Sequence, residues 1–202
     1  KNIIDNIIVY NAINEFDSDD SYSKENLDIK INDVLNFNPS VQKIGYYSNF
    51  YENDIMYKDA IDFLIESNIQ MIEISAPKVD LSGFVKILDE DMRVDLKKYF
   101  LKYGNEDLKV NDIKSIIEYN NLDSIERSPY GQGIFKKIIN DTMSKKDFLE
   151  LKSRLMVEGN KFYNIPMDEY KLDAVLSVNN YHAGYAAVAH NPALTVPMGL
   201  RE

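Results

Sequence analysis

Cysteine is absent from this 202-residue sequence, which excludes disulfides, thiolate nucleophiles and zinc sites built on cysteine. Tryptophan is absent too, so 14 tyrosines and 9 phenylalanines supply the aromatic part of the core. Histidine occurs only at His182 and His190, and no paired carboxylate motif accompanies them, which makes a metal site a weak case. The residue types alone therefore contain no complete catalytic site, and we expect no cofactor.

Basic residues are fewer than acidic ones: 23 Lys and Arg stand against 33 Asp and Glu, which gives a net charge of -10. Such a surface repels phosphate backbones, so nucleic acid is not an expected partner. Two tight acidic clusters stand out, Asp17-Ser18-Asp19-Asp20 and Asp89-Glu90-Asp91. Neither continues into a calcium-loop pattern, so we expect a solvated loop or helix start at each.

Long apolar runs are also lacking. The first residues, Lys1 to Ile8, carry charges and two asparagines and do not form a leader pattern. The longest weakly polar run, 183–200, contains His190, Asn191 and two prolines, so no membrane span is expected. We expect a small-residue helix there, followed by a buried strand. The absence of thiols leaves the compartment open, with the cytoplasm slightly favoured.

Familiar catalytic loops are missing. No Gly-x-Ser-x-Gly elbow occurs, and Gly131-Gln132-Gly133 lacks both the preceding strand and the later glycine of a dinucleotide-binding loop. Ser144 stands beside Lys145, but at a helix start it is better explained as an N-cap.

Apolar periodicity predicts the elements of an α/β domain, or of part of one. Residues 43–48 and 70–74 are expected strands joined by a helix over 57–67, a βαβ unit with parallel strands. Further strands are expected over 173–177 and 193–196. The remaining expected helices cover 3–15, 84–103 with Ser82 as a possible cap, 112–119, 134–139 and 146–163, and the expected loops cover 17–24 and 36–40.

The C-terminal stretch carries the most specific motifs. Leu172-Asp173-Ala174-Val175-Leu176-Ser177-Val178-Asn179-Asn180 precedes a small-residue helix, and Asn191-Pro192-Ala193-Leu194-Thr195-Val196-Pro197-Met198-Gly199 follows it. In order, spacing and residue types this resembles the amidase signature family. The helix at Ile113 to Asn120 followed by Tyr130-Gly131-Gln132 is similar to a signature of a peptide-amidase-like branch. Similar matches at residues 3–20, where Glu15 replaces a usual glycine, and at 43–45 extend the resemblance over the whole chain.

This resemblance implies an α/β fold, part of an α/β/α sandwich with a mixed β-sheet flanked by helices. It implies one partial domain over 1–202, made of a helix and loop (1–40), a βαβ unit (41–80), a helical layer (81–170) and C-terminal strands (171–202). The family hydrolyses carbon–nitrogen (amide) bonds with a serine nucleophile, a bridging serine and a lysine base. These residues lie in a Gly/Ser-rich signature upstream of the matched region, and no Gly-Gly-Ser-Ser stretch occurs in this sequence. We therefore expect an internal fragment, inactive alone, with the catalytic triad outside the chain.

The resemblance also implies a substrate-pocket wall for a small amide or a peptide amide. The candidate lining residues are Asn179, Asn180, Tyr181 and His182 at a strand exit, with Gln132 from the helical layer. For each of them the alternative is that the side chain caps a turn or satisfies buried backbone. The expected partner is a complementing chain or a second copy, because a fragment exposes sheet edges.

Two other functions are compatible with the residues. The chain could be a non-catalytic remnant or partner-binding module of an amidase-like fold, which the absence of an upstream Gly/Ser-rich reading frame would favour. A small βαβ ligand-binding domain is the third possibility, but it leaves the motifs at 172–199 unexplained.

Overall fold

The computed structural model describes residues 2–20, 23–105 and 107–196. The chain divides into two compact units. The sheet unit takes its described residues from Lys1–Lys78, Lys161–Ala186 and Asn191–Glu202, and the helical unit consists of Val79–Asn160 and Ala187–His190. The expectation of one partial domain over 1–202 stays a prediction.

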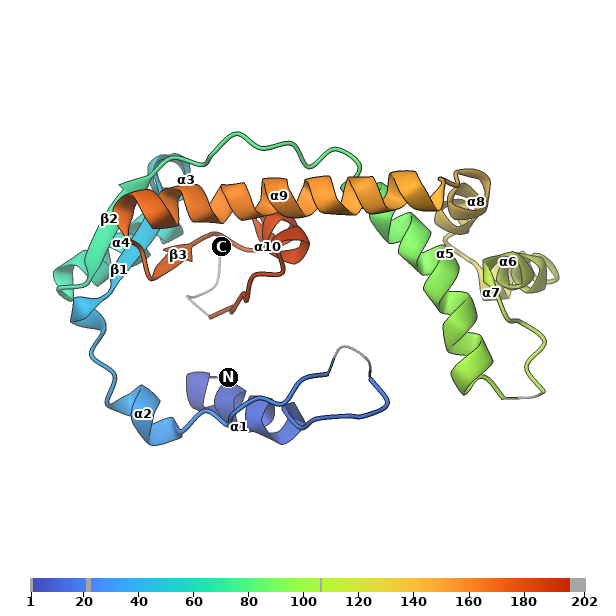
Figure 1. The fold of residues 1–202 in the computed structure, drawn as a ribbon, viewed down its shortest axis with the longest axis horizontal. Helices are drawn as coiled ribbons and strands as arrows, with labels where there is room; N and C mark the ends of the chain where they lie inside the picture. The colour runs from blue at the N-terminus through green and yellow to red at the C-terminus, as the bar shows by residue number, and fades with distance from the viewer. Residues whose placement is uncertain (1, 21–22, 106, 197–202) are drawn as a thin grey trace. The chain divides into compact units, whose positions relative to one another are not determined.

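The sheet unit contains α1 (Ile3–Ile13), α2 (Ile31–Leu35), η1 (Pro39–Val41), β1 (Lys43–Tyr47), α3 (Ser48–Asn53), α4 (Ile55–Glu66), β2 (Gln70–Ile74) and β3 (Ala174–Leu176). The helical unit contains α5 (Phe84–Tyr103), α6 (Ile113–Asn121), α7 (Ser124–Arg127) and α8 (Gly133–Asn140). Two helices, α9 (Lys145–Tyr170) and α10 (Ala183–Ala189), pass from one unit to the other (Figure 1).

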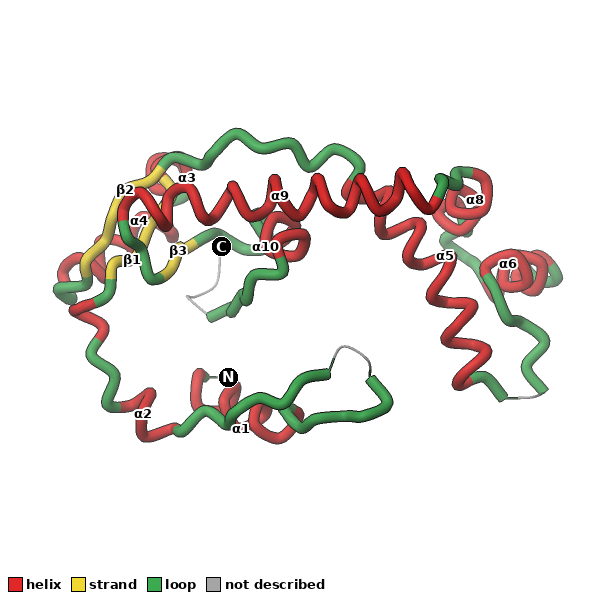
Figure 2. Tube along the Cα trace, viewed as in Figure 1, coloured by secondary structure: helices red, strands yellow, loops and turns green. Residues whose placement is uncertain are grey.

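The strands form a sheet with the order β2-β1-β3, drawn in yellow in Figure 2. Ile44 of β1 stands opposite Met71 on one side and Ala174 on the other, and both pairings are parallel. The predicted parallel βαβ unit and the α/β class are confirmed. The expected mixed sheet is not found, because every strand pairing among the described residues is parallel.

Alternate residues of β1 face opposite layers, as the period of a strand requires. Tyr46 packs on one face in a core with Tyr57 and Ile61 of α4. On the other face Tyr47 stacks against Phe162 of α9, with ring centroids 5.8 Å apart. Gly45 also lies on this second face, where an added Cβ would stand 2.7 Å from the Leu172 side chain. Helices thus cover both faces of the sheet, as an α/β/α arrangement requires.

The Leu172-Asp173 pair holds β1 and β3 in register. The Asp173 backbone N–H donates to the Lys43 carbonyl at 2.8 Å, and the Lys43 N–H donates to the Asp173 carboxylate at 2.9 Å. Asp173 therefore closes the amino end of the strand pair, while the preceding leucine fills the space above Gly45.

Helix α9 is longer than its sequence pattern predicts. Ser144 accepts from the Asp147 N–H at 3.1 Å, which confirms the predicted N-cap. At the other end the helix continues past Tyr163 to Tyr170, with Pro166 inside it. Proline lacks an N–H, so the carbonyl of Phe162 loses its helical donor. Phe162 and Pro166 are both buried against the sheet unit, and this packing keeps the helix continuous.

The helical unit has its own apolar core of Ile113, Ile117 and Ile138. Asp112 begins α6 with a capping box, because its carboxylate accepts from the Ser115 N–H at 2.8 Å and the Ser115 hydroxyl accepts in return.

The acidic cluster at Asp89-Glu90-Asp91 differs from the sequence expectation. It lies inside α5, and Asp89 and Glu90 are buried. Asp89 pairs with Lys137 at 2.6 Å, while Glu90 pairs with Arg93 and accepts from the Met143 N–H at 2.9 Å. These two carboxylates connect α5 to α8 and to the loop before α9, so they are structural rather than solvated.

Other expectations were wrong at element boundaries. Gly83, with φ of 87°, begins α5 in place of Ser82, whose hydroxyl donates to Asp80. The short helix α2 has no counterpart in the predictions. Residues 193–196 form no strand, and Leu194 and Val196 are exposed; the motif residues Pro197, Met198 and Gly199 lie outside the described residues.

In the described part of the chain no helix is long and apolar enough to cross a membrane.

Candidate functional site

The turn after β3 lies at the carboxyl end of the parallel sheet, where α/β proteins of open-sheet type bind ligands. The chain leaves Leu176, passes through residues 177–182 and enters α10. Asn179 has φ of 50°, a left-handed conformation that asparagine accepts more readily than most residues. The Ala183 N–H donates to the Asn180 carbonyl at 3.0 Å and closes the turn onto α10.

His182 lies in a box of aromatic rings. Its ring centroid is 4.5 Å from that of Tyr47, 4.8 Å from Phe162, 5.2 Å from Phe50 and 5.7 Å from Tyr185. Burial lowers the pKa of the His182 imidazole, which favours its neutral form near neutral pH. The rings and the burial together give His182 a fixed orientation.

Tyr57 joins the strand ends beneath this turn. Its hydroxyl accepts from the Tyr47 backbone N–H at 3.1 Å and donates to the Leu176 carbonyl at 2.8 Å. Burial raises the pKa of Tyr57 to about 12 and raises that of Tyr47 as well, so both phenols stay neutral. The Tyr47 hydroxyl is buried and finds no hydrogen-bond partner among the described residues.

Ser177 and His182 form the contact closest to a catalytic pair, with 2.9 Å between Oγ and Nδ1. A nucleophile–base pair works when a third group orients the base and donors surround the developing oxyanion. Among the hydrogen bonds of residues 2–20, 23–105 and 107–196, no carboxylate binds the His182 ring. The pair spans one turn and closes it. The sequence analysis missed Ser177, although a serine just before a strand-to-helix turn is a usable signal.

The five predicted site residues fall into two groups. Asn179, Asn180, Tyr181 and His182 share one turn, where the first three are exposed and His182 is half-buried. Gln132 belongs to the helical unit, where its amide accepts from Asn120 at 3.1 Å and donates to Asn121 at 2.8 Å and to the Ile117 carbonyl at 3.4 Å. A substrate-binding role stays a prediction for all five.

The acidic side chains and the histidines do not assemble into a metal site in the described part of the chain. Within the described ranges, no three His, Asp or Glu side chains are grouped so that they could hold a metal ion. Each of the two acidic clusters has a backbone or ion-pair partner instead: the Asp17 carboxylate accepts from the Asp19 N–H, and Asp89 pairs with Lys137.

No protein-family model and no curated protein sequence matches the chain. Solved structures do match it. An amidase family protein from Bacillus anthracis str. Ames aligns with a TM-score of 0.78 over 93% of this chain, at 22% identity. The peptide amidase PAM, solved in complex with the competitive inhibitor chymostatin, aligns with a TM-score of 0.78 over 100% of this chain, at 16% identity. The chain has an amidase-like fold.

Other alignments agree with this fold. The native peptide amidase from Stenotrophomonas maltophilia aligns with a TM-score of 0.58 over 75% of the chain, at 14% identity. The chain spans 38% of the length of the Bacillus anthracis protein and 46% of the length of PAM. The resemblance inferred from the sequence is thus confirmed for the amidase-like fold of this part of the protein.

Proposed function

We propose that this chain is part of an amide hydrolase, in which it supplies scaffold and one wall of the substrate pocket while the catalytic serines and lysine lie outside it. The observation that carries the proposal is the position of the turn at residues 177–182. This turn follows the carboxyl end of β3, the edge at which open α/β sheets bind ligands. The likeness to amidases is the second support, and the absence of a Gly-Gly-Ser-Ser stretch is the third.

In this proposal the neighbouring side chains have different roles. The exposed amides of Asn179 and Asn180 donate to or accept from the substrate's amide group. His182 is a positioning residue, because its ring is held by aromatic neighbours and by Ser177 rather than exposed to a substrate. The Tyr163 hydroxyl donates to the His182 carbonyl at 3.0 Å and holds the same turn from α9. The substrate is a small amide or a peptide amide.

The first experiment is labelling of the folded chain with a fluorophosphonate probe, read by intact mass. A heat-denatured sample is the control for non-specific reaction. We expect no adduct on the folded chain, because no carboxylate of the described residues hydrogen-bonds to the His182 ring and orients it as a base for Ser177. A single adduct that appears only on folded protein and disappears in Ser177→Ala would contradict the proposal, because the nucleophile would then lie in this chain.

The second candidate is a non-catalytic, partner-binding module of the same fold. It is favoured by the outer edge of β3, which pairs with no strand among the described residues. The two candidate functions can be distinguished by combining the chain with a polypeptide that carries a Gly/Ser-rich amidase signature. Amide hydrolysis that appears only in the combined sample, and that falls in Asn180→Ala, supports the enzyme. Stable association without hydrolysis supports the module.

A further inference from the structure

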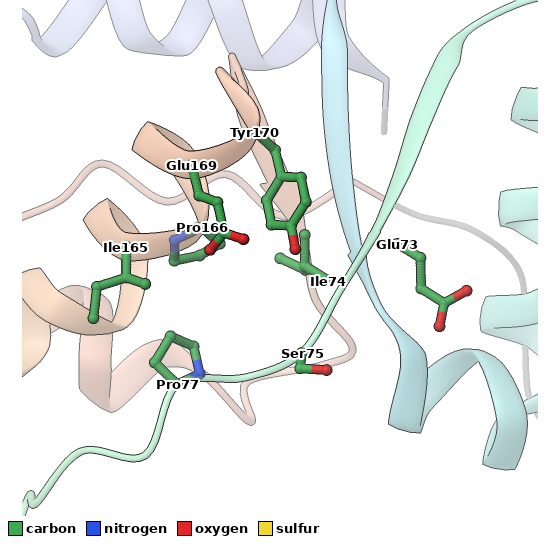
Figure 3. Close-up of a pocket in the computed structure, with 8 residues that line it drawn as sticks. All are labelled: Glu73, Ile74, Ser75, Pro77, Ile165, Pro166, Glu169 and Tyr170. Carbon is green, nitrogen blue, oxygen red and sulfur yellow. The ribbon is translucent and has the colours of Figure 1, made fainter.

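A small pocket in the sheet unit lies between the end of β2 and the last turns of α9, outside the turn at residues 177–182. Its volume is about 210 Å³, which is the liquid volume of about seven water molecules. Ser75 and Pro77, which follow β2, form one side, and Pro166, Glu169 and Tyr170 of α9 form the other (Figure 3). The space is smaller than the about 300–1,000 Å³ of typical ligand pockets and therefore suits only a small molecule.

The base of the pocket is apolar. Ile74, 2% exposed, and Pro166, also buried, close the floor and present little accessible surface, whereas Pro77 and Ile165, the latter 49% exposed, supply the apolar lining that a ligand can reach. In Figure 3 the Tyr170 ring stands beside Ile74, so an aromatic surface adjoins this base. Such surfaces bind the apolar body of a ligand, and the ring also attracts a cation placed over its face.

One carboxylate serves the pocket. Glu169 lies between Pro166 and Tyr170 in Figure 3, and its nearby carboxylate raises the pKa of Tyr170. Among the ion pairs of the described residues none involves Glu169. Glu73 also borders the pocket, but its side chain points away in Figure 3 and accepts from the Tyr46 hydroxyl at 3.4 Å.

We propose that this pocket binds a small alkylammonium ion, with the ammonium group on the Glu169 carboxylate and the Tyr170 ring and the alkyl chain on Pro77 and Ile165. A carboxylate and an aromatic ring next to an apolar base recognise both parts of such an ion. The net charge of -10 also favours cations over anions near the chain. This binding is independent of the proposed amidase role.

The test is a titration of the whole chain with n-pentylammonium, followed by the backbone amide NMR signals of Ser75, Glu169 and Tyr170. Two neutral or anionic analogues of the same length, n-pentanol and pentanoate, are titrated in parallel. We expect saturable shifts at these amides with pentylammonium, binding of pentanol that is weaker by about threefold or more, and no saturation with pentanoate. Equal binding of pentylammonium and pentanol, or shifts scattered over the surface, would overturn the proposal.

Substitutions in and beside the pocket test where the ammonium group binds. Glu169→Gln should weaken pentylammonium binding by about threefold or more and leave pentanol binding unchanged. Asp168→Asn is the matched control, because it removes the same charge from the adjacent exposed residue, which does not line the pocket. Tyr170→Leu should weaken binding by about threefold through loss of the ring face. Equal losses in Glu169→Gln and Asp168→Asn would mean that only the overall charge matters, and this result would overturn the site.

Discussion

Replacing Tyr57 with phenylalanine removes a hydroxyl that joins the carboxyl ends of β1 and β3. The Tyr47 N–H and the Leu176 carbonyl then lose this partner, while the aromatic ring keeps its packing. Tyr57 is 3% exposed, so water does not readily replace the lost bonds. A buried donor or acceptor left without a partner costs about 1–3 kcal/mol. With two such groups, we expect the free energy of unfolding of the sheet unit to fall by about 2–6 kcal/mol.

Two measurements detect this decrease in the free energy of unfolding. Urea unfolding gives the total change in the free energy of unfolding, and hydrogen exchange of the Tyr47 amide gives the local one. A loss of about 2 kcal/mol speeds exchange of that amide by about 30-fold. Tyr51→Phe is the control, because its hydroxyl donates to the partly exposed Asp62 carboxylate at 2.7 Å. We expect that control to cost less than about 1.5 kcal/mol.

One result would contradict this role of the Tyr57 hydroxyl. The free energy of unfolding of Tyr57→Phe could lie within about 0.5 kcal/mol of that of the original chain, with the Tyr47 amide exchanging at its original rate. In that case the Tyr57 hydroxyl does not hold the strand ends. The turn at residues 177–182 would then have to be positioned by the contacts of His182 alone.

Three further changes test other parts of the structure. Gly45→Ala places a Cβ 2.7 Å from a leucine side chain; we expect a loss of about 1 kcal/mol in urea unfolding, whereas Gly133→Ala, which meets nothing within 4 Å, should cost nothing. Asp112→Ala removes the acceptor for the Ser115 N–H, and we expect the helical unit to lose about 1 kcal/mol, checked by urea unfolding followed by circular dichroism. Because folding raises the pKa of Tyr57 from 10.0 to about 12, its contribution is complete below about pH 10 and is lost as the pH rises through about 12. The urea midpoint should therefore fall across this range, and fall less in Tyr57→Phe; a flat midpoint would contradict the shifted pKa.

Local pattern predicted the strands β1 and β2 of the sheet unit, for physical reasons. Residues 70–74 include the β-branched Ile72 and Ile74, and their strand was predicted with the observed limits. The limits of α9 were not predictable in this way, because Pro166 normally ends a helix and the compensating burial of Phe162 comes from a distant strand. Gly83 was missed for a similar reason: its left-handed backbone follows from the path of the chain, whereas Ser82 is the better cap by composition alone.

The candidate site, too, was predicted from the sequence only in part. The motif at residues 172–180 located the turn after β3 from sequence, and the likeness to amidases agrees with it. The sequence did not reveal that His182 faces Tyr47 and Phe162, or that Ser177 meets its ring. Aromatic residues far apart in the chain give no local pattern that identifies which of them will pack together.

The sequence by itself determined the α/β class, the parallel βαβ unit and the resemblance to amidases, because these depend on periodicity and on motifs contained in short segments. It also excluded cysteine chemistry outright, because the residue does not occur. Only the tertiary structure decided that the Tyr57 hydroxyl joins two strand ends, that Asp89 and Glu90 are buried, and that Glu169 and Tyr170 border a pocket with Pro77. Each of these facts is a distance between segments remote in sequence, and such distances are set when the elements pack.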